Sequence, residues 1–322
     1  MESLQVRLNQ LENIRVVLAE PDVNLRRQIK ALLVEAGMKN VLDTDDIAQV
    51  RRAIDEDTVE LIIGDTAVDG GGLNKLITDV RHREIGDNPF IMFITMVDQP
   101  SVDSIRGAIN SGTDHILAKP IDGDALISLI IELTHTRKRF VVTTDYIGPD
   151  RRTKERPGTV VIPQIDVPNP LRQRMTGQMR ETTLRRTIET AWLKINEQKV
   201  ERHAFQIGWL LDRIIPEVGT PNADRSDEFP LHVKRLIDVS RDMARRIGKT
   251  RFAHVKEMSM TMTNLVEESI RNGFKSDDIR LMLKLSELIT ESFNTDRFNE
   301  DGTQARDHNA YMVEKENKTV TV

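Results

Sequence analysis

The sequence predicts an α/β domain built on a doubly wound, five-stranded parallel sheet, followed by a separate all-α helical domain. Residues 14–140 alternate short apolar runs with segments of helical period, a pattern typical of repeated strand–helix units. Residues 173–296 have almost only helical period. A chain of 322 residues has room for two such domains.

Short apolar runs predict the strands, and amphipathic segments between them predict the helices. Four of these apolar runs are Ile14–Ala19, Leu61–Gly64, Phe90–Ile94 and Ile116–Ala118. Helices are expected over residues 22–36, 45–54, 73–82, 102–110 and 124–136, and Gly37 gives the first of them a C-terminal stop signal. Five strands and five helices are expected in total.

Polar residues follow the strand runs. Glu20 and Asp22 come after the first run, Asp65 after the run at 61–64, Thr95 after the run at 90–94, and Lys119 after the run at 116–118. The carboxyl ends of parallel strands share one edge, where ligands bind. These side chains are therefore expected to meet in one crevice. They are suited to holding a divalent cation and placing a phosphoryl group on a carboxylate.

This ordered set resembles the receiver domain of a bacterial two-component response regulator. Thr95 and Lys119 follow Asp65 by 30 and 54 residues, close to the spacing usual in that family. The resemblance covers about residues 14–140 and implies a flavodoxin-like fold. It also implies that Asp65 is the phosphoacceptor and that Thr95 and Lys119 bind the phosphoryl group and form the switch. Pro120, next to Lys119, is a candidate for a cis peptide bond.

The same resemblance implies a Mg2+ site. Its ligands would be Glu20, Asp22, Asp65 and the backbone carbonyl of Ala67, because Mg2+ prefers oxygen ligands in near-octahedral geometry. Pro21 separates the two acids of the first loop, where the family usually has adjacent acids.

Other residues also depart from the family pattern. Ile116 occupies a position where Tyr or Phe is common, Met96 is bulkier than the usual small residue, and Val68-Asp69 replaces the usual Met-Pro. A non-phosphorylated pseudo-receiver that acts as a scaffold or docking protein therefore stays open as the alternative.

The expected boundaries follow changes in composition. Residues 1–13 are an N-terminal extension, 14–140 the receiver domain, 141–172 a Pro-rich basic linker, 173–296 a helical bundle for output or dimerisation, and 297–322 a disordered tail. The segment Tyr146–Arg152 looks like a short segment that recurs after receiver domains. A turn is expected from Pro216 to Pro230 within the helical part.

The helical half is expected to be a bundle of about four helices that works by protein contact. His203 and His254 leave a less favoured role as a histidine phosphotransfer intermediary open. His203 lies on an apolar stripe with Trp192, Ile195 and Ile207, where a packed histidine is the ordinary interpretation. Acidic residues interleave with the basic ones and there is no helix-turn-helix pattern, so a nucleic-acid partner is not expected.

Composition narrows the class of protein. The formal net charge is −5 and the pI about 5.9, which argues against a protein built around a basic nucleic-acid surface. The chain has no cysteine and no run of apolar residues long enough to span a membrane. We expect a cytoplasmic, non-enzymatic signalling protein. Its partners would be a sensor histidine kinase or phosphotransfer protein, and a protein target or a second copy.

Overall fold

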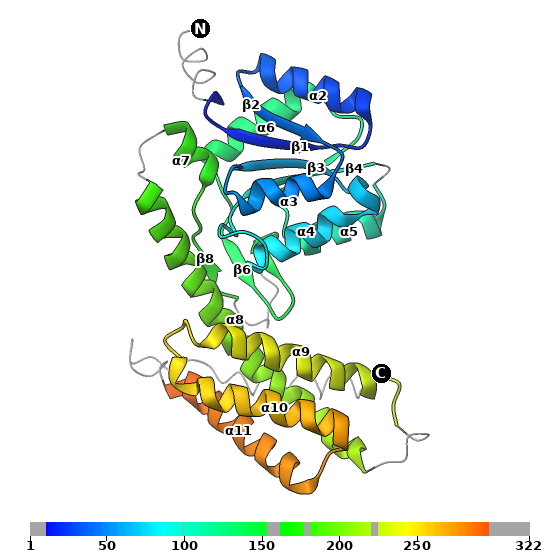
Figure 1. The fold of residues 1–322 in the computed structure, drawn as a ribbon, viewed down its shortest axis with the longest axis vertical. Coiled ribbons are helices and arrows are strands. Elements are labelled where there is room, and N and C mark those ends of the chain that lie inside the picture. The colour runs from blue at the N-terminus through cyan, green and yellow to red at the C-terminus, as the bar shows by residue number, and fades with distance from the viewer. Residues whose placement is uncertain (1–10, 99, 153–161, 177–180, 220–224, 296–322) are drawn as a thin grey trace. The chain divides into compact units, whose positions relative to one another are not determined.

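The computed structural model describes residues 11–98, 100–152, 162–176, 181–219 and 225–295 (Figure 1). These residues form two compact units. The described residues up to 152, together with 163–192, make the first unit. Residues 193–295, with Ile162, make the second. The expected tail, 297–322, and most of the expected N-terminal extension lie outside the described residues.

The first unit contains a five-stranded sheet in the order β2-β1-β3-β4-β5. All of its strand pairs are parallel. The strands are β1 (Arg15–Ala19), β2 (Asn40–Thr44), β3 (Leu61–Asp65), β4 (Met92–Val97) and β5 (His115–Ala118). This confirms the predicted doubly wound parallel sheet. Because the carboxyl ends of parallel strands all lie at the same edge, the chain must cross back to the opposite edge between strands, usually through a helix.

Helices cover both faces of the sheet. Alternate residues of each strand point to opposite faces of the sheet. In β1, Val16 and Leu18 lie on one face, and Val17 and Ala19 lie on the other. The first face packs against α2 (Val23–Glu35) and α6 (Gly123–His135), and the second against α3 (Ile47–Asp55) and α4 (Gly72–Arg81). α5 (Val102–Ser111) contacts α4. Because both faces are covered, the inner strands β1, β3 and β4 are buried and apolar over most of their length, as predicted from their short apolar runs.

Local signals fix the helix starts. Asp22, Asp46, Ser101 and Asp122 are N-caps whose side-chain oxygens accept hydrogen bonds from backbone N–H groups of the first turn. The five predicted helices agree with α2 to α6 to within about two residues at each end, the usual uncertainty of helix ends. A short 3-10 helix, η1 (Val68–Gly70), precedes α4.

The chain after α6 forms a second, three-stranded antiparallel sheet in the order β7-β6-β8. Its strands are β6 (Phe140–Val142), β7 (Ile147–Pro149) and β8 (Gln164–Ile165), followed by α7 (Pro170–Thr176). All residues of β6 and β7 are buried. Much of the segment expected to be a linker is thus packed structure within the first unit. Pro149 ends β7, Pro163 directly precedes β8 and Pro170 begins α7, positions that the missing N–H of proline permits.

The Asp150 side chain, directly after β7, is bonded to β8 of this small sheet. Its carboxylate accepts hydrogen bonds from Arg152 Nη2 (2.7 Å) and Nε (2.9 Å), and from Gln164 Nε2 (2.6 Å) in β8. These bonds, first among them those from Arg152, hold the pKa of Asp150 well below its ordinary value of 3.8 although burial opposes this. The ionised form therefore stabilises the fold. That contribution is complete above pH 3.8 and is lost as the pH falls through the lowered pKa.

We expect Asp150→Asn to lower the free energy of unfolding by about 1–2 kcal/mol at neutral pH, because it removes charge-assisted hydrogen bonds. The difference from wild type should shrink once the pH falls below the ordinary carboxyl pKa. Melting temperatures of both proteins at pH 7 and near pH 3 test this. Asp166→Asn, in an exposed ion pair with Arg139, is the control and should change little at either pH. A difference that stays the same at low pH would contradict the assignment.

The second unit is helical, as predicted. It contains α8 from Leu193 onward (the whole helix is Glu181–Val218), α9 (Phe229–Ile247), η3 (Ala253–Val255), α10 (Lys256–Asn272) and α11 (Ser276–Thr295). Its core is formed by the inward stripes of these helices, among them Ile207, Leu211, Met262, Val266 and Ile289. No helix among the described residues is both long enough and apolar enough to cross a membrane.

One expectation in this half is wrong. α8 continues through Pro216 to Val218, so the turn begins later than predicted. Residues at the end of a helix tolerate proline when packing on the helical core outweighs the lost hydrogen bond, and Ile214 beside it is fully buried.

Candidate functional site

The loops after β1, β3, β4 and β5 bring the predicted site residues to the carboxyl edge of the sheet. In the register of the sheet Ala19 pairs with Gly64, Gly64 with Thr95, and Val97 with Ala118. Glu20, Asp65 and Lys119 therefore begin their loops at similar heights. This is the geometric reason why residues up to about a hundred positions apart in the sequence can contact one another.

Lys119 joins the two buried acids. Its Nζ lies 2.8 Å from Glu20 Oε2 and 2.6 Å from Asp65 Oδ2. Glu20 and Asp65 are 0% and 1% exposed. Partial burial opposes the charge on Lys119, but the bonds to Asp65 and Glu20 outweigh it and raise the pKa of the lysine. The lysine is therefore a fixed positive charge beside both carboxylates. The Lys119–Pro120 peptide bond is cis.

The other oxygens of the two acids are held by the backbone. Glu20 Oε1 accepts a hydrogen bond from the N–H of Asp22 (2.9 Å), and Asp65 Oδ1 accepts one from the N–H of Ala67 (2.5 Å). These bonds orient both carboxylates towards Lys119. Ala67 lies at the start of η1, in the loop that follows Asp65.

Asp22 lies apart from this pair. Its side chain is solvent-exposed and caps α2 by accepting hydrogen bonds from the N–H groups of Asn24 (2.8 Å) and Leu25 (2.9 Å). The bonds from Leu25 and Asn24 lower the pKa of Asp22. Its predicted role as a metal ligand stays a prediction, while its role as a helix cap is plain.

The residues fit a magnesium ion. Among the described residues, no three His, Asp or Glu side chains lie together as a ready metal site. Glu20 and Asp65, however, each direct an oxygen at the same cationic group, so their carboxylates converge on one point. Mg2+ is usually held by one or two carboxylates with several water molecules, and a nearby carbonyl such as that of Ala67 is a suitable further ligand.

Thr95 is fully buried, and its hydroxyl is bonded to a residue outside the acidic pair. Its Oγ1 donates a hydrogen bond to Thr113 Oγ1 (2.8 Å) in the loop before β5. Thr113 Oγ1 in turn lies 3.0 Å from the carbonyl oxygen of Phe93 and 3.1 Å from that of His115. Nothing local in the sequence marks Thr113, because the partner of its hydroxyl lies 18 residues away.

A buried ion cluster fixes the same loop from the other side. Asp114 Oδ2 accepts from Arg81 Nη2 (2.7 Å), and Asp114 Oδ1 accepts from Arg137 Nη2 (3.2 Å). Arg81 is 1% exposed and its guanidinium also lies 5.1 Å from the centre of the Phe140 ring in β6. Burial lowers the pKa of Arg81 to about 10 although Asp114 opposes this, so it stays charged at neutral pH. The cluster thus links α4, the loop before β5 and the small sheet.

The two histidines considered for phosphotransfer have different surroundings. His203 is 2% exposed and its Nε2 lies 2.8 Å from Asp242 Oδ2, while Arg246 Nε donates to the same carboxylate. Burial lowers the pKa of His203. His203 is therefore a packed histidine in an ion network, as the ordinary interpretation predicts. His254 is exposed in η3.

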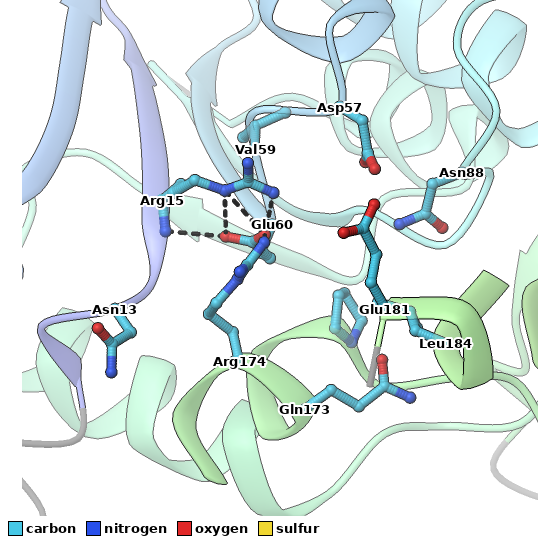
Figure 2. Close-up of a pocket in the computed structure, with 11 residues that line it drawn as sticks. Asn13, Arg15, Asp57, Val59, Glu60, Asn88, Gln173, Arg174, Glu181 and Leu184 are labelled. Carbon is cyan, nitrogen blue, oxygen red and sulfur yellow. Dashed lines mark hydrogen bonds and ion pairs between the residues drawn. The ribbon is translucent and has the colours of Figure 1, made fainter. Parts of the chain in front are cut away.

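A separate pocket of about 530 Å³ lies at the amino ends of the strands, away from the acidic pair. Figure 2 shows Arg15 and Arg174 directed at Glu60, whose Oε1 accepts from Arg174 Nη2 (2.7 Å) and also from Arg15. Arg15 begins β1, and Glu60 immediately precedes β3. This ion cluster holds α7 against the amino edge of the sheet. Because Glu60 already pairs with both arginines, the cluster has a structural explanation.

Comparison with known families agrees with this geometry. Residues 16–131 match the family model of the response regulator receiver domain. These residues form a receiver domain. The matched range contains Glu20, Asp65, Thr95 and Lys119, and it ends within α6. The receiver domain supports a role in phosphorelay signalling and indicates a signalling protein rather than a catalyst.

Other comparisons add little beyond the receiver domain. A search of curated proteins gives no match. Among solved structures, this chain is similar to a Burkholderia pseudomallei protein described as pilus assembly-related. The two share 18% identity with a TM-score of 0.33, over 38% of this chain and 90% of that chain.

Proposed function

We propose that this chain is a response regulator that accepts a phosphoryl group on Asp65 with the help of Mg2+. The observation that supports this most is the contact of Lys119 Nζ with both Asp65 and Glu20, at the carboxyl edge of a receiver domain. A buried acid beside a fixed cation is suited to this reaction, because the incoming phosphoryl group and the carboxylate would otherwise repel each other.

The reaction balances without further groups. A carboxylate oxygen of Asp65 attacks phosphorus, and the bond between phosphorus and the donor's leaving atom breaks. The leaving group keeps that electron pair, and the product is an acyl phosphate. Lys119 pairs with a phosphoryl oxygen as a point charge. When bound by Glu20 and Asp65, Mg2+ supplies positive charge that neutralises the acids and the phosphoryl group.

Thr95 is the proposed switch residue. Its hydroxyl donates to Thr113 in the resting arrangement and has one proton to donate. A phosphoryl oxygen on Asp65 is a stronger, charged acceptor, so the hydroxyl would turn to it. This movement would alter the loop after β4, which is the usual kind of local switch in a signalling domain.

The helical unit is the proposed output, and it would act through protein contact. The described residues 193–295 are almost entirely helical, and α11 exposes Leu281 and Leu288 on one side, seven positions apart. Exposed leucines spaced by two helical turns suit contact with another helix. We propose a sensor histidine kinase or a phosphotransfer protein as the donor, and a protein target or a second copy as the receiver of the signal.

Incubation with a small phosphodonor tests the proposal. The full chain with acetyl phosphate and Mg2+ should gain the mass of one phosphoryl group. Removing Mg2+ with excess EDTA should slow this gain by at least about 100-fold, because the acids and the phosphoryl group then repel each other. A protein that gains no mass, and whose spectra do not change with beryllofluoride, would contradict the proposal.

The runner-up function is a pseudo-receiver that docks a partner without being phosphorylated. The capping role of Asp22 favours it, because that side chain is engaged with α2 rather than with the acidic pair. The two functions differ in one result: the pseudo-receiver gains no mass under any donor and Mg2+ concentration, yet it still binds its partner.

A further inference from the structure

The hairpin formed by residues 140–152, which contains β6 and β7, packs directly on the loop before β5. Gly112 in that loop has φ +91°, and a Cβ atom there would lie 2.6 Å from the carbonyl oxygen of Ile147. A Cβ atom on Gly148 would lie 2.8 Å from the Cα of Gly112. Backbone therefore touches backbone at this point, and only glycine permits so close an approach. The loop therefore cannot move without displacing the backbone of the hairpin.

Hydrogen bonds connect the same two segments. Arg151, at the end of the hairpin, donates from its Nη2 to the carbonyl oxygen of Thr113. Tyr146 donates from its hydroxyl to the carbonyl oxygen of Pro149 (2.9 Å), which fixes its side chain along β7. The motif Tyr146–Arg152 thus has a structural role in docking the hairpin on the receiver domain.

Thr113 has contacts in two directions. Its side chain accepts the hydrogen bond from Thr95, and its carbonyl accepts the one from Arg151. Both threonines are fully buried, so no water replaces a bond that is lost. If the Thr95 hydroxyl rotates away, the oxygen of the Thr113 hydroxyl loses its hydrogen-bond donor. Thr113 must then shift, and its backbone carbonyl is bonded to Arg151 of the hairpin.

We propose that Thr113 is a relay that couples the position of the Thr95 hydroxyl to the order of the hairpin at residues 140–152. Phosphorylation as the cause of the Thr95 movement rests on the proposed function, but the coupling itself belongs to the resting protein. The hairpin leads along the chain towards the helical half. A change in its order is therefore a route by which the site affects the segment that follows the receiver domain.

Hydrogen exchange of the unphosphorylated full chain tests the relay. Thr95→Val removes the donor, and we expect amides of residues 147–152 to exchange at least about fivefold faster, at the lower end of usual coupling between sites. Thr95→Ser keeps the hydroxyl and should restore exchange to near the wild-type rate. Thr113→Val should have the same effect as Thr95→Val, and the double variant should add little to either, since both remove one bond.

Thr134→Val is the matched control. Thr134 is as buried as Thr95, but its hydroxyl bonds only within α6, to the carbonyl oxygen of Ile131 (2.7 Å). It should leave the hairpin amides unchanged. Rates are compared with those of β1 amides, so that a general loss of stability is separated from a local one. Unchanged hairpin exchange in Thr95→Val, or an equal rise in Thr134→Val, would overturn the relay.

The relay and the proposed function fail separately. If acetyl phosphate adds no mass but Thr95→Val loosens the hairpin, the relay stands and the phosphoacceptor role falls. If the protein gains a phosphoryl group but Thr95→Val leaves the hairpin unchanged, the relay falls and the phosphoacceptor role stands.

Discussion

Asp65→Asn is expected to slow phosphoryl uptake from acetyl phosphate by at least about 100-fold, because the amide is not a nucleophile at phosphorus. The fold should persist. Asn has nearly the same shape, its oxygen can still accept the bond from the N–H of Ala67, and Lys119 keeps its pair with Glu20. Intact mass after a timed incubation measures the effect.

Asp69→Asn is the control for this variant. Asp69 lies four residues further along the same loop, and it is exposed in η1. It should gain mass at the wild-type rate. Equal rates of phosphoryl uptake in Asp65→Asn and wild type would show that Asp65 is not the phosphoacceptor.

Asp114→Asn is expected to cause the largest loss of stability, about 3–5 kcal/mol, because it leaves two buried guanidinium groups without their shared carboxylate. Arg81 and Arg137 have side chains 1% and 4% exposed. The carboxylate also accepts a hydrogen bond from the backbone N–H of Phe93 (2.9 Å) in β4, and an amide cannot serve all three donors as well. A loss of this size corresponds to a fall in melting temperature of the first unit of about 10 °C or more.

Scanning calorimetry of the full chain resolves the melting of the first unit. Asp103→Asn is the control: its carboxylate is 93% exposed and forms only a surface pair with Arg106, so the change should be within about 0.5 kcal/mol. A loss below about 1 kcal/mol for Asp114→Asn would show that the cluster is not what anchors the loop before β5.

Sequence reasoning succeeded where the signal was local and periodic. The end of α2 follows from the stop signal at Gly37, which has φ +98°, and the strand cores follow from short apolar runs. The convergence of Glu20, Asp65 and Lys119 follows from one topological fact, that parallel strands end at the same edge. Little else was needed to place these three residues.

It did less well where the partner is distant in the chain. A proline-containing segment was expected to be a linker, but β6 pairs with β8 more than twenty residues later, and no local pattern indicates that pairing. Arg81 reads as an ordinary surface arginine on a helix, and only the tertiary fold brings it to Asp114. The position of Asp22 after the first strand and before the first helix is compatible both with a metal ligand and with a helix N-cap. The resemblance emphasised the metal, and the structure shows the helix cap.

Chemical trapping locates the phosphoryl group and so tests whether Asp65 is the acceptor. Wild-type protein treated with acetyl phosphate and Mg2+ is reacted with hydroxylamine, which converts an acyl phosphate to a hydroxamate, and peptides are sequenced by mass spectrometry. We expect a hydroxamate at Asp65 and at no other residue. A hydroxamate at another acid, or at no residue, would contradict it.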